Sequence, residues 1–262
     1  MQGILQVRMD SARLWGKALL AISGRPVISY NIERLRRAQT LTGIVVATST
    51  APADDAIEDW AASEGLAVFR GHPKDVLDRI YRCAHHFGLS EFAKFTADNP
   101  LIDPAVVDQV VGYYLAHPGE YNYVSNNHPA TWQDGQQVEV ISLPALNASW
   151  QEASRPFQRE HVTPFIWDQP HRFRLANVAR RTDDWYRQYR WTLDYPEDFH
   201  FVRRVYEELY PASPTFDTIE LMRFLDARPD ITALNAARRG EVWYAANSSE
   251  LQTYGMIDKG EE

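Results

Sequence analysis

Hydrophobic and polar residues follow two different periods along the first 120 residues of the chain. Short apolar runs are typical of buried strands, and they occur at residues 4–7, 44–47, 66–69 and 92–96. Between the runs, apolar residues recur every three or four positions, which predicts helices over residues 26–38, 54–64, 75–87 and 104–115. This alternation indicates an α/β fold, with a mostly parallel sheet covered by helices on both faces.

The pattern changes after about residue 121. Further strands are expected at residues 121–124, 138–141 and 172–178, and helices at residues 144–153 and 157–167. Residues 190–194 predict a strand that returns to the sheet, and residues 197–209 a helix. We therefore expect a main α/β domain made of residues 1–120 and 190–235, interrupted by a smaller lobe at residues 121–189. The polar tail, residues 236–262, is expected to be frayed.

Composition narrows the possible partners. The 262 residues carry a net charge of −8, which is against a nucleic-acid-binding face because such a face needs a large basic surplus. The single cysteine, Cys83, excludes an intramolecular disulfide and a cysteine-based zinc site. No apolar run approaches the roughly 18 residues of a membrane span, and the first residues lack the order of a signal peptide. The sequence predicts a cytoplasmic protein that binds neither nucleic acid nor membrane.

The segment that follows the first strand places cations beside a hydroxyl and a glycine. These residues are Arg8, Ser11, Arg13, Gly16 and Lys17. At the carboxyl end of a strand, such a group is suited to binding a polyphosphate. The segment is neither a Walker A loop nor a G-x-G-x-x-G loop, since both patterns are absent. It indicates a different way of holding a triphosphate.

The same segment resembles the signature loop of the sugar-activating nucleotidyltransferases, roughly A-R-x-x-S-x-R-L-x-G-K. The likeness to their cytidylyltransferase family continues through most of residues 3–235. The matching blocks are residues 43–48 (GIVVAT), 54–57 (DDAI), 68–71 (VFRG), 75–79 (DVLDR), 96–103 (TADNPLID), 123–127 (YVSNN), 159–166 (REHVTPFI) and 190–199 (RWTLDYPEDF). The family includes CMP-Kdo synthetase, CMP-sialate synthetase and, most similar to this chain, the spore-coat polysaccharide cytidylyltransferase-like proteins.

This resemblance implies a Rossmann-like, mostly parallel nucleotide-binding sheet of the nucleotide-diphospho-sugar transferase type. The inserted lobe would contribute to the acceptor pocket and to a homodimer contact. Arg8, Ser11, Arg13 and Lys17 would bind the triphosphate, with Lys17 and Arg8 in catalytic positions next to the reacting phosphorus. Positioned cations stabilise charge on the α-phosphate and on departing pyrophosphate. Solvated surface charge is the alternative for each cation read alone.

The loop departs from the family at three positions. Asp10, Ala12 and Trp15 stand where glycine, threonine and proline are usual. Asp10 adds negative charge near the expected phosphates, and Trp15 changes the stiffness of the loop. Because the cations are kept, we expect altered tuning of the loop rather than loss of binding.

Two aspartates follow predicted strands and precede turns that contain proline. Asp98 stands before Asn99-Pro100, and Asp194 stands before Tyr195-Pro196. The resemblance implies that both ligate Mg²⁺, which proteins hold through one or two carboxylates plus substrate phosphates. Asp98 then counts among the catalytic residues. A turn or helix-capping aspartate is the alternative for each.

The nucleotide base is expected at the carboxyl ends of the second and third strands. The candidates are Thr48, Ser49, Arg70, Asp75 and Arg79. Backbone groups and an arginine can recognise the amino, ring-nitrogen and carbonyl groups of cytosine. Asp75 and Arg79 fit a helix N-cap and its partner four residues later equally well.

A further group of residues is expected around the acceptor. These residues are Asn126, Asn127, Gln137, Glu139, Arg159, Glu160 and His161. Close relatives commonly have an aspartate before V-E-V, where this chain has Gln137, so we expect a pocket with less negative charge that tolerates a strongly anionic acceptor. Arg159 and His161 are candidate clamps for a carboxylate or a phosphonate. Packing or surface exposure is the alternative for the histidine.

Together these features predict a Mg²⁺-dependent cytidylyltransferase. It would transfer CMP from CTP to a small anionic acceptor, a sugar acid or a phosphonate, and release pyrophosphate. UTP is the close competitor of CTP. A nucleotide-sugar glycosyltransferase is one alternative, although Ala97-Asp98-Asn99 is not the D-x-D motif that would favour it. A non-catalytic nucleotide-binding protein is the other, and it predicts loss of cations or aspartates that this chain retains.

Overall fold

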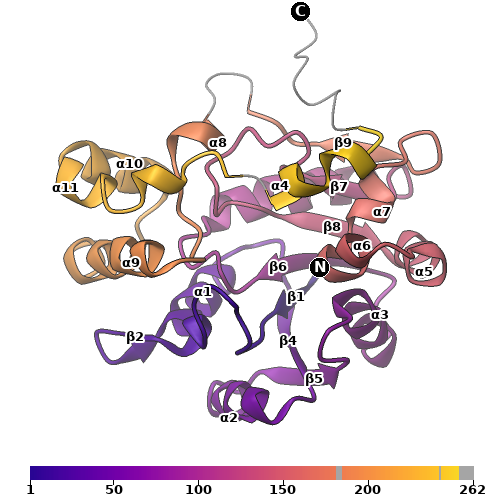
Figure 1. The fold of residues 1–262 in the computed structure, drawn as a ribbon, viewed down its shortest axis with the longest axis horizontal. Coiled ribbons are helices and arrows are strands. Elements are labelled where there is room, and N and C mark those ends of the chain that lie inside the picture. The colour runs from indigo at the N-terminus through magenta and orange to yellow at the C-terminus, as the bar shows by residue number, and fades with distance from the viewer. Residues whose placement is uncertain (181–184, 242, 254–262) are drawn as a thin grey trace, which may run out of the picture.

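The computed structural model describes residues 1–180, 185–241 and 243–253. Its centre is a seven-stranded sheet with the strand order β5-β4-β1-β6-β8-β7-β9 (Figure 1). The strands are β1 (Gln2–Gln6), β4 (Gly43–Ser49), β5 (Ala67–Gly71), β6 (Glu91–Thr96), β7 (Tyr123–Ser125), β8 (Glu139–Ser142) and β9 (Leu175–Asn177). Strand β1 pairs in parallel with β4 and β6, and β4 pairs in parallel with β5. The predicted α/β fold with a mostly parallel sheet is therefore confirmed.

Helices cover both faces of the sheet because successive strand residues point to opposite sides. Ile4 and Leu5 of β1 illustrate this, since they belong to different apolar clusters. The Leu5 face is covered by α1 (Val27–Leu35), α2 (Asp55–Ser63) and α4 (Pro104–Ala116). The Ile4 face is covered by α3 (Val76–His86), α5 (Leu143–Glu152), α6 (Pro156–His161) and α7 (Pro164–Trp167).

The remaining elements flank this three-layered body. Helices α9 (Pro196–Glu208), α10 (Thr218–Asp226) and α11 (Pro229–Thr232) gather beside α1 in a third apolar cluster (Figure 1). The shorter elements are the hairpin β2 (Ala21–Ile22) with β3 (Arg25–Pro26), helix α8 (Trp185–Gln188), and the 3₁₀ helices Lys17–Leu19, Pro52–Asp54, Ala236–Arg238 and Trp243–Glu250. Among the described residues, no helix is long and apolar enough to cross a membrane.

The region expected to be an inserted lobe continues the main sheet. Strand β8 pairs antiparallel with β6 and β7, and β9 pairs in parallel with β7. The strand predicted at residues 190–194 is wrong, because only Arg190 forms an isolated bridge, to Asp134. The backbone of this segment is bonded to loops instead: the Trp191 amide donates to Asp134 (2.7 Å), and the Leu193 amide donates to Asp98 (2.7 Å). Hydrogen bonds between loops therefore take the place of the expected strand pairing.

The C-terminal segment is packed as far as the structure describes it, so the prediction of a frayed tail is wrong up to residue 253. Leu251 is buried against the α3 face of the sheet. The Gln252 and Thr253 amides both donate to the carboxylate of Asp168, at 3.0 and 2.8 Å. Residues 254–262 lie outside the described residues.

Candidate active site

The loop that follows β1 is fixed by one buried carboxylate, Asp54. Its Oδ1 accepts from the Met9 amide (2.7 Å), and its Oδ2 accepts from the amide (3.1 Å) and the hydroxyl of Ser49. The carbonyl of Met9 in turn accepts from the amides of Ser11 (3.0 Å) and Gly16 (2.9 Å). Gly16 has φ 67°, a left-handed conformation that glycine adopts without strain. The loop is thus a preformed turn, held to the end of β4.

Lys17 leaves this loop to meet the two predicted metal ligands. Its Nζ donates to Asp194 (2.7 Å), to the Leu193 carbonyl (2.7 Å) and, more weakly, to Asp98 (3.3 Å). Arg13 also pairs with Asp194 (2.8 Å). Burial raises the pKa of Asp194, but Lys17 and Arg13 outweigh it and hold the pKa at about 2. The structure therefore brings together four residues that the sequence placed in one site.

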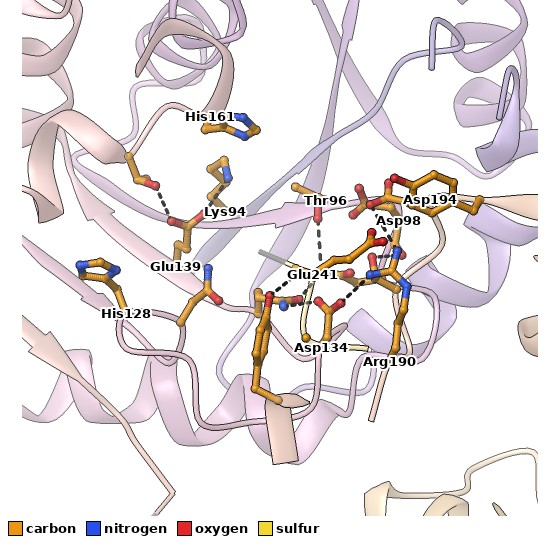
Figure 2. Close-up of a pocket in the computed structure, with 18 of the residues that line it drawn as sticks. Lys94, Thr96, Asp98, His128, Asp134, Glu139, His161, Arg190, Asp194 and Glu241 are labelled. Atoms are coloured by element: carbon orange, nitrogen blue, oxygen red, sulfur yellow. Dashed lines mark hydrogen bonds and ion pairs between the residues drawn. The ribbon is translucent and has the colours of Figure 1, made fainter. Parts of the chain in front are cut away.

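The donor set around Lys17 is suited to Mg²⁺. Asp98 and Asp194 come from different parts of the chain and lie side by side (Figure 2). No group of three or more His, Cys, Asp and Glu side chains with metal-site geometry occurs within the described ranges. Two carboxylates without a third protein ligand match the way Mg²⁺ is held, with phosphate oxygens and water filling the other positions.

A cavity of about 670 Å³ opens beside these aspartates and is called the acceptor cavity below. Seven residues predicted for the site line it: Arg13, Asp98, Asn127, Gln137, Glu139, His161 and Asp194. Other lining residues were not predicted, among them Lys94, His128, Asp134, Arg190 and Glu241 (Figure 2). The cavity thus runs from Asp98 and Asp194 on one side to the histidines on the other.

A buried ion pair forms the floor of the cavity near His161. Lys94 donates to Glu139 at 2.6 Å, and the hydroxyls of Tyr123 (2.7 Å) and Thr163 (2.6 Å) donate to the other carboxylate oxygen. Burial raises the pKa of Glu139, but Lys94 outweighs it, so the pKa lies below its usual range. Burial lowers the pKa of His161 to about 4, and Lys94 acts in the same direction. His161 is therefore expected to be neutral at pH 7, and its part in binding the acceptor stays a prediction.

The expected deficit of negative charge around Gln137 is also wrong. The Gln137 amide donates to Asp134 (2.8 Å), and its carbonyl oxygen accepts from Asn99 (3.1 Å) and from the Gly135 amide (2.9 Å). Asp134, three residues earlier, brings a carboxylate into the same cavity. A carboxylate therefore remains in the cavity beside Gln137.

Two arginines were predicted to contact the substrates, Arg70 at the base and Arg159 at the acceptor. In the structure, both form ion pairs with other side chains instead. Arg159 donates twice to Asp75 (2.9 and 2.5 Å) and once to the Trp150 carbonyl (2.8 Å). Asp75 also caps α3 by accepting from the Asp78 amide. Arg70 is engaged by Asp55 and Glu58, both at 2.6 Å. Neither guanidinium lines the cavity, so the arrangement is against Arg159 as an acceptor clamp and against a free Arg70 at the base.

Three other predicted acceptor and base residues do not line the cavity. Asn126 bonds the Gln136 carbonyl (2.7 Å) and the Val138 amide (2.9 Å), which shapes the loop before β8. Glu160 lies 3.8 Å from Arg8. Thr48 is fully buried, and its hydroxyl has no partner among the described residues.

Arg8 and Arg79 form a second cationic group. Arg79 is fully buried and donates to the His72 carbonyl (3.0 Å), while its Nε and Nη2 have no partner within the described part of the chain. Burial, with Arg8 nearby, lowers the pKa of Arg79 to about 10. Gly71 allows the close approach, because a Cβ there would lie 2.9 Å from the Arg79 side chain. Two neighbouring cations, of which Arg79 has unused donors, are suited to an anion.

The comparisons with known proteins agree with this geometry. A model of the cytidylyltransferase family matches residues 2–225. The protein MJ1063 of Methanocaldococcus jannaschii is 34% identical over 239 residues, which cover 89% of this chain and 93% of that protein. The spore coat polysaccharide biosynthesis protein SpsF of Bacillus subtilis is 29% identical, over 87% of this chain and 94% of its own length.

A solved structure is also similar over nearly the whole chain. A cytidylyltransferase from Leptospira borgpetersenii superposes with a TM-score of 0.82 at 26% identity, covering 92% of this chain and 98% of that one. These findings are against a nucleotide-sugar glycosyltransferase and against a non-catalytic protein. Since the family match spans most of its length, the chain belongs to the cytidylyltransferase family of nucleotidyltransferases, which use CTP.

Proposed function

We propose that this enzyme transfers CMP from CTP to an anionic acceptor in a Mg²⁺-dependent reaction that releases pyrophosphate. The observation that carries the proposal is the contact of Lys17 with both Asp98 and Asp194 at the edge of the acceptor cavity. Arg8 and Arg79 form a second cationic group, and Arg79 has donors that are suited to an anion. We place the α-phosphate at Lys17, because the acceptor must reach this phosphate from the cavity.

The reaction forms one P–O bond and breaks another. An acceptor oxygen attacks the α-phosphorus in line, and pyrophosphate leaves from the opposite side with its bridging oxygen. Mg²⁺ held by Asp98 and Asp194 would neutralise charge on the phosphate oxygens. Lys17 would add its charge where the transition state is most negative. To do so, the Lys17 ammonium would give up a hydrogen bond to an aspartate and donate to a phosphate oxygen instead.

The nucleotide half of the site is proposed to include the end of β4. Thr48 has a buried hydroxyl without a partner among the described residues, and Ser49 is held in place by Asp54. Because these two residues are held in place, we propose that the cytosine base binds at the end of β4. Ser11 and Arg13 belong to the same loop as Lys17 and complete the proposed triphosphate site.

The acceptor is proposed to be a sugar acid or a phosphonate. A volume of about 670 Å³ is large enough for a sugar acid, and the name of the relative SpsF refers to polysaccharide biosynthesis. The homodimer and the cytoplasmic location expected from the sequence stay predictions.

The test is pyrophosphate release from CTP and Mg²⁺ with a panel of sugar acids and phosphonates. We expect release that depends on one class of acceptor, on CTP rather than UTP, ATP or GTP, and on a divalent ion. Release that persists in the presence of a chelator would overturn the metal dependence. Failure of every acid acceptor, with transfer to a neutral sugar phosphate instead, would overturn the acceptor class.

A further inference from the structure

One lysine in the acceptor cavity has hydrogen-bond donors that the proposed reaction does not use. Lys94 lies on β6, is only 5% exposed and lines the cavity. Its Nζ donates to Glu139 at 2.6 Å, and this ammonium makes no other hydrogen bond within the described part of the chain. An ammonium has three N–H donors. Two of them are therefore available to a group that enters the cavity.

Glu139 fixes the position of the Lys94 ammonium. The two residues lie opposite each other in the antiparallel pair of β6 and β8. The other carboxylate oxygen of Glu139 accepts from the hydroxyls of Tyr123 (2.7 Å) and Thr163 (2.6 Å). A buried ion pair costs desolvation energy, and apolar residues of similar volume can often replace it without loss of stability. Its place at the wall of a substrate cavity therefore favours a function beyond packing.

The two lining histidines show which part of the cavity has a positive potential. Burial lowers the pKa of both imidazoles to about 4. At His161, the neighbouring charge with the largest effect is that of Lys94, which lowers the pKa and outweighs Glu139. At His128, the charges of Asp168 and Glu139 both raise the pKa instead. The surroundings of His161 therefore favour an anion, whereas those of His128 oppose one.

The other basic side chains that line the cavity already have carboxylate partners. Arg190 forms a two-bond pair with Asp198, at 2.9 Å for each bond. Arg13 pairs with Asp194 (2.8 Å) at the end of the cavity where the metal is proposed. Figure 2 shows Lys94 beside His161, toward the other end. Within the described ranges, Lys94 is thus the lining lysine or arginine with donors available away from the metal.

We propose that Lys94 binds the acid group of the acceptor next to His161, and that the attacking oxygen lies outside this acid group and reaches the phosphate at Lys17. The inference rests on the proposed function. A charged ammonium with two available donors forms strong hydrogen bonds to an acid group. A phosphonate that attacks through its own acid oxygen would leave Lys94 unused, because its acid group must lie at the α-phosphate. Lys94 is therefore a specificity-determining residue that sets the direction in which the acceptor lies.

The test compares acceptors that differ only in the acid group. The probes are 3-deoxy-octulosonic acid and N-acetylneuraminic acid, each paired with its C1 primary amide, which keeps the attacking hydroxyl and loses the charge. Pyrophosphate release from CTP and Mg²⁺ is measured for each probe. We expect kcat/KM to be at least about 10-fold higher for the acid of the reactive pair. Equal values for acid and amide would overturn the inference, while release from either one still supports the transfer of CMP.

Ethylphosphonate is the contrasting probe, because its acid oxygens are its only nucleophiles. Transfer to ethylphosphonate without transfer to either sugar acid would overturn the inference and leave the proposed function intact. No release with any of the probes would overturn both.

Two variants of the ion pair should change the binding of the acid in opposite directions. Lys94→Met removes the ammonium, so we expect KM for the acid to rise at least about 10-fold, with a smaller change in kcat. Glu139→Gln keeps the ammonium and removes the opposing charge, so KM for the acid should fall below that of the wild type. An ion pair that only supports the fold would make both variants worse for acid and amide alike. An unchanged KM for the acid in Lys94→Met would overturn the inference.

A double variant keeps the test valid if Lys94→Met does not fold. Lys94→Met with Glu139→Gln leaves no unpaired buried carboxylate, and the glutamine can still bond Tyr123 and Thr163. It should lose the preference for the acid over the amide, and a preference equal to that of the wild type would overturn the inference. Lys74→Met is the matched control, because Lys74 is exposed and does not line the cavity.

Discussion

The ammonium of Lys17 lies 2.7 Å from the Asp194 carboxylate and is also within reach of Asp98. Burial lowers the pKa of Lys17, but the two aspartates outweigh it, so the pKa lies above its usual range and the side chain stays charged. The lysine thus occupies the position between two carboxylates that a divalent ion would take. Lysine and Mg²⁺ should compete for these oxygens until phosphate oxygens offer the ammonium another partner.

Replacing Lys17 should therefore increase the effect of Mg²⁺ on stability. In Lys17→Ala without metal, Asp98 and Asp194 repel each other, and a divalent ion relieves this repulsion. We expect Mg²⁺ to raise the melting temperature of Lys17→Ala more than that of the wild type, measured by calorimetry without nucleotide. The control is Lys74→Ala, which removes an exposed lysine elsewhere. Equal shifts in Lys17→Ala and the wild type would mean that Lys17 and Mg²⁺ do not share ligands.

Asp98→Asn should preserve the fold and slow turnover. The change keeps the shape of the side chain but withdraws a charge from the divalent ion and from Lys17. We expect kcat to fall at least about 100-fold, as when one strong electrostatic contribution is removed, with the circular dichroism spectrum unchanged. Asp59→Asn, an exposed aspartate on α2, serves as the control. Near-normal turnover of Asp98→Asn at saturating Mg²⁺ would contradict a metal-binding role.

Asp198 should be essential for stability, although it is not a candidate ligand of either substrate. It is fully buried and accepts from Arg190, from the amides of Asp194 and Tyr195, and from Asn235. Asp198→Ala leaves the Arg190 charge without its main partner, so we expect a loss of about 3–5 kcal/mol in the free energy of unfolding. Urea denaturation measures this loss. The neighbouring, more exposed Glu197→Gln should change the same quantity by less than about 0.5 kcal/mol.

His161 should make the protein less stable in acid. Its folded-state pKa is about 4, below the usual value of 6.5, so between these values the unfolded chain binds more protons than the folded protein does. Above about pH 6.5 the histidine is neutral in both states and does not change the free energy of unfolding. As the pH falls from 6.5 toward 4, protons bind to the unfolded chain first, so the free energy of unfolding decreases. His161→Gln should show a smaller loss of unfolding free energy between pH 7.5 and pH 5 than the wild type. Parallel curves for the two proteins would contradict this assignment.

The sequence predicted the parts of the site that depend on strand ends. Asp98 follows the confirmed strand β6, and the first-loop cations follow the confirmed strand β1. Asp194 was grouped with them correctly for the wrong reason, because the strand expected before it is a loop. Lys94 was missed because it lies inside the apolar strand β6, where no end or turn marks it. Its exposure to the cavity depends on the antiparallel pairing of β6 with β8, which places Lys94 opposite Glu139. Such a long-range register is not encoded in a local pattern.

Arg159 shows the opposite error. A block that resembles the family, with an arginine and a histidine, suggested a clamp, but the partner of Arg159 is Asp75, 84 residues earlier. The sequence predicted that Asp75 caps a helix, but not that its second carboxylate oxygen accepts from Arg159. Charged residues find partners through tertiary packing, so a sequence alone shows which cations exist and leaves open which of them are already neutralised.

The bonds of Asp54 have a consequence for how this enzyme can change during evolution. One carboxylate joins the amide of Met9, in the loop proposed to hold the triphosphate, to the amide of Ser49, at the edge proposed to hold the base. A shift of one segment is therefore transmitted to the other. A substitution that widens the base site for a purine should also displace the phosphates and slow turnover with CTP. Among the described residues, Asp54 makes no hydrogen bond to a residue that lines the acceptor cavity, so acceptor preference is free to diverge while nucleotide choice stays fixed.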